Sequence, residues 1–192
     1  ILEKMVERSR DRASRQKLTH LIEFKVADAQ NLPFEDNLFD AVLTESVTAF
    51  PEDKQKAVNE YARVTRPGGY VGLNETVWLK VPPPPEVVAW ASQDVGASVK
   101  PLTTDEWKGL LTAAGLRDIT SSIHTVDIQV EAKGILRRYG WGGILRIFGR
   151  TFRLYFKSPA YRDFVRRTRQ GGITPEHLDE YFGYGIFIGR KE

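Results

Sequence analysis

The sequence predicts an open α/β sheet, and three observations lead to that prediction. Two short apolar segments, 21–27 and 38–44, have the composition of strands. An amphipathic helix over 53–66 follows them and stops at a Pro-Gly-Gly turn, after which another apolar strand begins. Helical and strand patterns then alternate to the last residues, as in an α/β fold. Ligands bind such sheets outside the carboxyl ends of the strands, which directs attention to 28–29, 44–46 and 74–75.

The composition is that of an ordinary soluble protein with one sizeable core. The chain has 192 residues, of which 41% are hydrophobic and 28% charged. The absence of cysteine excludes disulfides, zinc–cysteine sites and thiol nucleophiles, and we expect a cytoplasmic location. No apolar run reaches the ~18 residues that a membrane span requires, and the first residues do not have the pattern of a signal peptide.

The first half of the chain reads as helix, strand, strand, helix, strand. The polar segment 1–16 has apolar residues at helical spacing, which predicts a surface helix. Phe24 and Val26 alternate with charged residues in the strand 21–27, whereas 38–44 is apolar throughout its centre and predicts a buried parallel strand. One face of the helix 53–66 carries Ala57, Val58, Tyr61, Ala62 and Thr65. A glycine with positive φ in the following turn leads into a strand over 70–77.

The second half begins with a proline-rich segment, 81–85, which predicts a stiff spacer before a helix from about 86 to 99. The best-marked helix follows. Thr103 and Glu106 form a capping box, Leu102 and Trp107 occupy the flanking hydrophobic positions, and Gly115 ends the helix. A strand over 117–128, an irregular helical stretch over 129–180 with a start at Thr174-Pro175, and a last strand over 181–191 complete the expected elements.

The positive charge is concentrated in one segment. Residues 137–169 contain ten Arg or Lys and one acid, a net charge of +9 that leaves −6 for the rest of the chain. This pattern indicates a local partner and no nucleic-acid binding by the whole protein. One interpretation is an amphipathic lid that recognises an anionic or lipid-like substrate or touches a membrane surface. We favour the other interpretation, a helical cap whose aromatic residues form a core and whose arginines are solvated.

Several motifs together resemble a known family. The segments are Val26-Ala27-Asp28-Ala29, Leu32-Pro33-Phe34, Phe39-Asp40 and Pro67-Gly68-Gly69, and the stretch 183–190 is similar to the family's last, antiparallel strand. They resemble the middle of a class I S-adenosylmethionine (SAM)-dependent methyltransferase of the type found in ubiquinone and menaquinone biosynthesis. The resemblance implies an enzyme with a Rossmann-like sheet, SAM as cofactor, and methyl transfer to a small-molecule or lipid-like acceptor.

The resemblance divides the chain into a partial methyltransferase core at 1–128, a basic helical insert at 129–180 and the last core strand at 181–192. No glycine-rich strand–loop–helix precedes this core, so we expect a sheet that is truncated at its N-terminus. Either the chain is a fragment of a longer enzyme, or it pairs the Leu21 strand with the Leu38 strand or exchanges strands in a homo-oligomer. The alternative function is a non-catalytic binding or assembly module that keeps the fold without a complete cofactor site.

The resemblance also assigns candidate cofactor-binding residues. Asp28 would accept from the adenine amine, the Ala29 N–H would donate to a ring nitrogen, and Leu32 would wall the ring. Thr44, Glu45 and Ser46 would line the methionine end of SAM, and Glu45 is the candidate catalytic base. Without the resemblance, Asp28 is a turn former, and Thr44 and Ser46 cap the next turn.

Other residue types that could carry chemistry are interpreted as structural. We expect Asp40 and Glu75 to be carboxylates satisfied by hydrogen bonds within the fold. The three histidines, His20, His124 and His177, lack metal-ligand spacing. The segment 140–143 resembles part of a phosphate loop but follows no apolar strand, so it predicts no phosphate site.

Overall fold

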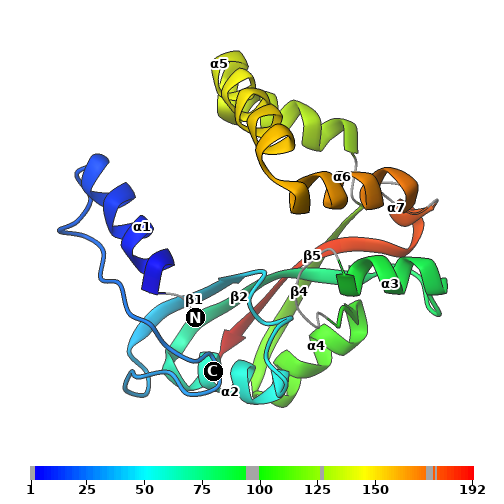
Figure 1. The fold of residues 1–192 in the computed structure, drawn as a ribbon. Coiled ribbons are helices and arrows are strands. Elements are labelled where there is room, and N and C mark those ends of the chain that lie inside the picture. Colours follow the sequence, from blue (N-terminus) through cyan, green and yellow to red (C-terminus); the bar gives the residue numbers. More distant parts are fainter. Residues whose placement is uncertain (1–2, 94–99, 126–127, 172–174, 176) are drawn as a thin grey trace. The chain divides into compact units, whose positions relative to one another are not determined.

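The structure is a computed structural model of residues 1–192 that describes all of them except 1–2, 94–99, 126–127, 172–174 and 176. The elements alternate between helix and strand, as the sequence predicts, over most of the chain (Figure 1). In chain order they are α1 (Glu3–Arg15), β1 (Phe39–Glu45), α2 (Lys54–Val64), β2 (Thr65–Trp78), α3 (Pro85–Gln93), β3 (Leu102–Thr103), α4 (Thr104–Ala113), β4 (Leu116–Thr125), α5 (Ile128–Lys157), α6 (Pro159–Gly171), α7 (Leu178–Tyr181) and β5 (Phe182–Lys191).

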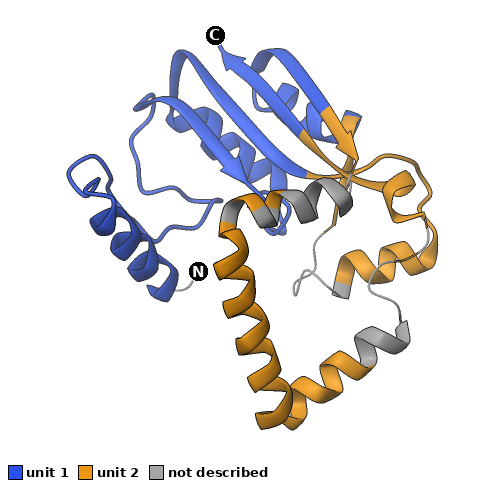
Figure 2. Cartoon of the chain, turned by 90° about the horizontal axis from the view of Figure 1, so that it is seen from above, with its two compact units in different colours: residues 1–75, 105–122, 186–192 blue, residues 76–104, 123–185 orange. Residues whose placement is uncertain are grey.

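The chain forms two compact units, which Figure 2 shows in blue and orange. Unit 1 comprises 1–75, 105–122 and 186–192, and unit 2 comprises 76–104 and 123–185. The strand order is β1-β2-β5-β4, with β3 beside β2. β1 and β2 are parallel, and their register aligns Ala41 with Tyr70 and Glu45 with Asn74. The sheet therefore has the Rossmann-like character expected from the sequence.

In unit 1, α2 and α4 pack against one face of the sheet. The predicted stripe of α2 is buried throughout, and Asp53 caps the helix by accepting from the Lys56 N–H at 2.9 Å. From α4, the fully buried Trp107 lies 6.2 Å, between ring centroids, from Phe187 of β5. The Gln55 amide joins the two helices by donating to the Leu110 carbonyl at 3.1 Å.

The first part of β2 is irregular and is built around glycine, with the positive φ that the sequence predicts, although the strand begins earlier than predicted, at Thr65. Gly68 has φ +80°, a conformation that L side chains rarely adopt. At Gly69, an added Cβ would lie 2.6 Å from the Asp40 carbonyl oxygen, so the backbone of β1 approaches too closely for any side chain. These two glycines let β2 depart from regular extended backbone between Thr65 and Tyr70, where its register with β1 shifts, and still lie directly beside β1.

Two expectations about the first strands are wrong. Residues 21–27 form no strand, and Leu21 is 71% exposed. Alternation of apolar and polar residues gives strand propensity, but a strand also needs a hydrogen-bonded neighbour, and no described strand pairs with this segment. The Leu21 segment therefore does not lie beside the Leu38 strand as a pair. Strand exchange with a second copy stays a prediction.

The strand predicted at 38–44 is confirmed as parallel β1, but it is not buried on both faces. β1 is the edge strand of the described sheet, and Leu43 is 79% exposed. The continuous apolar run correctly indicated a parallel strand, while its burial depended on neighbours that the run itself does not encode.

Unit 2 has a small apolar core of its own. Val87 and Ala91 of α3 pack with Leu178 and Phe182, and the rings of Trp78 and Trp90 meet Phe182 edge-on at 5.8 and 5.4 Å. Lys80 and Glu180 add a surface ion pair at 2.8 Å. The predicted helix over 86–99 is confirmed as far as Gln93, and the rest of it, like Thr174, lies outside the described residues.

The helical stretch predicted over 129–180 contains α5, α6 and α7. Gly140 adopts φ +61° and kinks α5, so segment 140–143 is a helix kink and has no strand before it, in agreement with its interpretation as no phosphate site. The expectation that the aromatic residues here form a core is wrong for the described ones. Trp141 is 73% exposed and Phe152 is 69% exposed.

Candidate functional site

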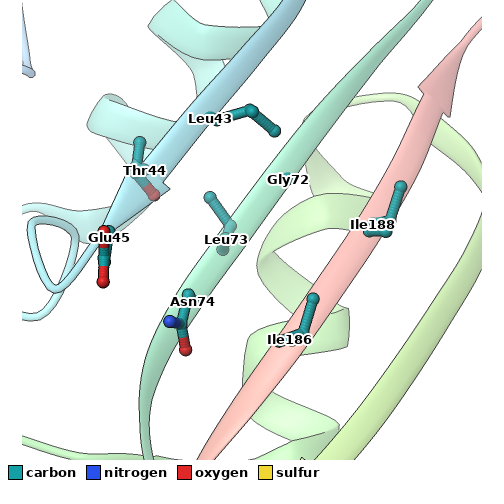
Figure 3. Close-up of a pocket in the computed structure, with 8 residues that line it drawn as sticks. All are labelled: Leu43, Thr44, Glu45, Gly72, Leu73, Asn74, Ile186 and Ile188. Atoms are coloured by element: carbon teal, nitrogen blue, oxygen red, sulfur yellow. The ribbon is translucent and has the colours of Figure 1, made fainter. Parts of the chain in front are cut away.

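A groove of about 440 Å³ lies beside the carboxyl end of β1 and the middle of β2, in unit 1 (Figure 3). Its lining residues come from three strands: Leu43, Thr44 and Glu45 from β1, Gly72, Leu73 and Asn74 from β2, and Ile186 and Ile188 from β5. The register of the parallel pair sets Leu43 beside Gly72 and Glu45 beside Asn74. The groove therefore lies at the carboxyl end of the parallel strand β1, and the carboxyl ends of parallel strands are where open α/β sheets bind ligands.

The groove exists because Gly72 has no side chain. A Cβ there would lie 2.7 Å from the Leu43 Cδ2 atom, so any larger residue would fill the space between β1 and β2. Leu43, Ile186 and Ile188 make the floor apolar, and all three are exposed. Glu45 at the end of β1 and Asn74 within β2 add a carboxylate and an amide (Figure 3). The groove thus combines an apolar floor with two polar groups at one end.

The loop after β1 is held by a buried carboxylate. Glu75 is 1% exposed, and its Oε1 accepts from the N–H groups of Val47 at 3.1 Å and Thr48 at 2.7 Å. Burial raises the pKa of this carboxyl, while the backbone donors oppose the rise. The other oxygen, Oε2, has no hydrogen-bond partner among the described residues. Glu75 therefore has the expected structural role through one of its two oxygens, which holds residues 47 and 48 of the loop after β1.

Ser46 begins that loop in an unusual conformation. Its φ is +52°, and its N–H donates to the Asn74 carbonyl at 2.9 Å. Two residues earlier, the Thr44 hydroxyl lies 3.2 Å from the Thr48 hydroxyl. The polar run 44–46 is therefore tied both to the end of β2 and to its own loop, which favours a rigid edge on the groove.

Tyr61 of α2 connects this loop with the second candidate segment. Its phenol is buried, and burial raises its pKa, with the carboxylates of Glu75 and Asp28 adding to the rise. Both acids must therefore lie within electrostatic range of the same hydroxyl. The fold thus brings the Asp28 loop and the loop after β1 to the same region of unit 1, although Asp28 does not line the groove.

Asp28 forms a turn. Its Oδ1 accepts from the Gln30 N–H at 2.9 Å, and its carbonyl accepts from the Asn31 N–H at 3.0 Å. The turn-former interpretation is therefore confirmed as a structural role, and it leaves the carboxylate exposed. Ala29 and Leu32 follow in the same loop and are half-buried.

An ion pair on α2, Glu60 with Arg63, clamps this loop. Glu60 Oε2 accepts from the Leu32 N–H at 2.7 Å, and Arg63 donates to the carbonyls of Leu32 at 3.1 Å and Phe34 at 2.8 Å. Within the pair, Arg63 Nε meets Glu60 Oε1 at 2.7 Å, and this bond lowers the pKa of Glu60. Sequence reasoning missed both residues. Their i, i+3 spacing on the polar side of the α2 pattern was the available signal.

The remaining polar candidates give no second site. Asp40 pairs with Arg66 at 2.6 Å on the surface, as a structural carboxylate would. His177 lies 2.9 Å from Glu180, and His124 stacks on Tyr184. Over the described ranges, no group of three or more His, Cys, Asp or Glu could hold a metal ion. Within those same residues, no helix has the length and apolar character required to cross a membrane.

The protein comparisons agree with this fold. Residues 1–73 match the family model described as a methyltransferase domain. An uncharacterized protein of Haemophilus influenzae is 33% identical over 132 residues, covering 68% of this chain and 52% of the relative. The 27-O-demethylrifamycin SV methyltransferase of Amycolatopsis mediterranei is 36% identical over 118 residues, covering 60% of this chain and 43% of the relative. The chain thus spans about half the length of the curated relatives it matches.

Solved structures define the fold. A putative sarcosine dimethylglycine methyltransferase from Galdieria sulphuraria superposes with a TM-score of 0.71 at 17% identity, over 100% of this chain and 67% of that one. The fold is therefore that of the Rossmann-like methyltransferases. The domain match over 1–73, the relatives and this fold together support a class I SAM-dependent methyltransferase, with S-adenosylmethionine as the family's cofactor.

Proposed function

We propose that this chain contributes to methyl transfer from S-adenosylmethionine to a small-molecule or lipid-like acceptor, as part of a longer enzyme. The observation that carries the proposal is the groove at the carboxyl end of β1, within which Glu45 of β1 and Asn74 of β2 stand beside an apolar floor. An apolar cleft with a few convergent polar groups is the usual form of a small-molecule site. The relative from Amycolatopsis is named for a methyl transfer to a rifamycin, which is a small-molecule acceptor.

The residues of the Asp28 loop suit the adenine of S-adenosylmethionine. An exposed carboxylate at Asp28 can accept from an exocyclic amine. The Ala29 N–H makes no hydrogen bond to any residue that the structure describes, so it is available to a ring nitrogen. The Leu32 N–H is occupied by Glu60, so Leu32 would contribute its side chain alone. The chemistry of this set fits the cofactor, and Thr44, Glu45 and Ser46 would hold its methionine end.

When bound, S-adenosylmethionine supplies a methyl group on a positively charged sulfur that is already activated for in-line displacement. The chain's own contribution is then alignment and exclusion of water. Leu43, Ile186 and Ile188 would exclude water along the groove floor. Glu45 would orient the acceptor and take its proton where the nucleophile must lose one. The Asn74 amide, opposite Glu45 in the strand register, would fix the acceptor's polar group.

Isothermal titration with S-adenosylmethionine tests the proposal. The two samples are this chain and the chain together with any upstream residues that its gene encodes. Binding by either sample supports a cofactor site, and methyl transfer to an added acceptor by the same sample supports the enzyme. Binding by neither sample would refute the proposal and favour the alternative, a binding or assembly module that keeps the fold.

Two substitutions at Asp28 separate its turn from its proposed contact with the cofactor. Asp28→Asn keeps an oxygen that can accept from the Gln30 N–H, whereas Asp28→Ala removes it. A hydrogen bond to a charged group is worth ~1.5–3 kcal/mol, so the alanine variant should lose roughly 10- to 150-fold in affinity for S-adenosylmethionine. The asparagine variant should fall between it and the wild type at unchanged stability. Unchanged affinity for S-adenosylmethionine in a stable Asp28→Ala protein would show that Asp28 acts only as a turn residue.

A further inference from the structure

The second half of α5, residues 141–157, separates apolar and basic side chains onto different sides of one helix. Trp141, Leu145, Phe148, Phe152 and Phe156 recur at intervals of three or four residues, which places them along one stripe. Arg146, Arg150, Arg153 and Lys157 recur at the same intervals, roughly 130° further round the axis at 3.6 residues per turn. We call these sets the aromatic stripe and the basic stripe. In the linear sequence the members of the two sets alternate, and the helix separates them.

The aromatic stripe is exposed to an unusual degree. Its five members are between 64% and 73% accessible to solvent. Large apolar side chains on monomeric proteins are normally scattered, and a contiguous exposed set marks an interaction surface. The stripe thus requires a partner that covers it.

α6 extends the apolar surface. It meets α5 at a bend near Ser158 within unit 2, where the two helices are drawn in orange (Figure 2). An apolar pocket of about 530 Å³ lies between them, lined by Leu145, Phe148, Phe152 and Tyr155 of α5 and by Tyr161 and Val165 of α6. Arg162 holds the bend by donating to the carbonyls at the end of α5, Tyr155 at 3.2 Å and Phe156 at 3.3 Å. Both helices therefore present their apolar sides to one common pocket.

The basic stripe is available to an external anion. Arg146, Arg150, Arg153 and Lys157 are exposed, and none of them forms an ion pair or side-chain hydrogen bond with another residue in the described part of the chain. The nearest acid in sequence, Asp163, is already paired with Arg166. The charge that faces outward is therefore positive and uncompensated.

We propose that α5 and α6 form a peripheral docking site for an anionic phospholipid surface. A helix with aromatic and leucine residues on one side and Lys or Arg on the other lies in the plane of a membrane interface, with its apolar side among the acyl chains. Residues 141–157 would lie along roughly 25 Å of that interface at 1.5 Å per residue. Trp141 and Tyr155 have the amphipathic rings that settle at the headgroup level, and the basic stripe complements the negative surface of anionic lipids. This inference does not depend on methyl transfer.

Co-sedimentation with vesicles tests the proposal with the full chain. The two vesicle types are phosphatidylcholine alone and phosphatidylcholine mixed with phosphatidylserine. We expect binding to the anionic vesicles, weakened by added salt. A Lys or Arg near an anionic surface contributes roughly fivefold in affinity, so Arg150→Gln with Arg153→Gln should weaken binding by about 25-fold. Arg8→Gln with Arg12→Gln in α1 is the matched control, because it removes the same charge from another exposed helix and should have little effect.

Two further measurements test the aromatic stripe. Phe148→Ser with Phe152→Ser should abolish vesicle binding while circular dichroism shows unchanged helix content. The fluorescence of the wild type should shift to shorter wavelength on binding, and Trp141→Phe should remove that shift, since Trp141 would enter the interface.

Three outcomes would overturn the proposal. They are no binding to anionic vesicles, equal loss in the α1 control and the α5 charge variant, and a self-associated chain whose assembly is lost in the Phe148→Ser/Phe152→Ser variant. The last outcome would assign the stripe to contact between copies of the chain.

Discussion

Replacing Glu75 should loosen the loop that follows β1, with an effect that depends on whether the acceptor or the charge is removed. Glu75 Oε1 serves two donors, and Thr48, which makes the shorter of the two bonds, is fully buried. In Glu75→Ala the Thr48 N–H has neither a protein acceptor nor water. A hydrogen bond to a charged group is worth ~1.5–3 kcal/mol. Water can replace the bond at the exposed Val47, and loss of a buried carboxylate offsets part of the cost. We therefore expect Glu75→Ala to lower the free energy of unfolding by about 2–3 kcal/mol.

Glu75→Gln is the matched variant. Its side-chain oxygen can still accept from Val47 and Thr48, while the charge is lost. We expect the free energy of unfolding at neutral pH to stay within about 1 kcal/mol of the wild type. The pKa of Glu75 is raised in the folded protein, so the folded state binds its proton more tightly than the unfolded state. Wild-type stability from this group is therefore present below its unfolded pKa and is lost as the pH rises through the folded pKa. The glutamine variant should lack this loss.

Urea unfolding of the three proteins at several pH values measures these effects through the denaturation midpoint at constant slope. Amide hydrogen exchange at Thr48 gives a local readout, and exchange should become faster in Glu75→Ala alone. Wild-type midpoints for Glu75→Ala would refute the claim that this carboxylate holds the loop. Equal destabilisation by both substitutions would show that the charge, and not the acceptor, matters.

Three further substitutions test contacts that join distant parts of unit 1. Lys191 Nζ donates to the carbonyls of Ala62 and Thr65, each at 2.8 Å, so Lys191→Met, which keeps the apolar stem, should cost about 1–2 kcal/mol in urea unfolding; no change would mean that water replaces these bonds. Gly69→Ala puts a Cβ 2.6 Å from a backbone oxygen and should cost about 1–3 kcal/mol, whereas Gly72→Ala meets only the movable end of Leu43 and should cost less than about 1 kcal/mol. A reversed order of the two melting temperatures would contradict this account.

Local patterns sufficed for the elements whose signals are contained within a few residues. α2 and the glycines that follow it form one continuous stretch, in which the apolar stripe and a positive-φ glycine were predicted and are confirmed. The parallel strand β1 and the last strand β5 followed from short apolar runs between turn residues. The turn at Asp28 and the buried role of Glu75 were also foreseen as structural interpretations.

Long-range contacts decided the features that sequence reasoning missed. The clamp made by Glu60 and Arg63 acts on a loop about thirty residues earlier, so no local pattern reveals its target. The groove floor joins Leu43 with Ile186 and Ile188, which are far apart in the chain and meet only because β5 lies next to β2. Neither the clamp nor the groove can be deduced before the strand order is known.

Most of the helices and strands, and the resemblance to the methyltransferases, could be predicted from the order of the amino acids alone, because periodicity, caps and glycine positions act over neighbouring residues. Tertiary structure decided which of those surfaces are covered. The Leu21 segment has the apolar–polar alternation of a strand but forms no strand, because a strand needs hydrogen-bonded neighbours. The aromatic stripe of α5 has the spacing of a core-facing helix and is exposed, because burial depends on what packs against it. The residues of a segment set its propensity for helix or strand, whereas the elements that pack against it decide whether its side chains are buried.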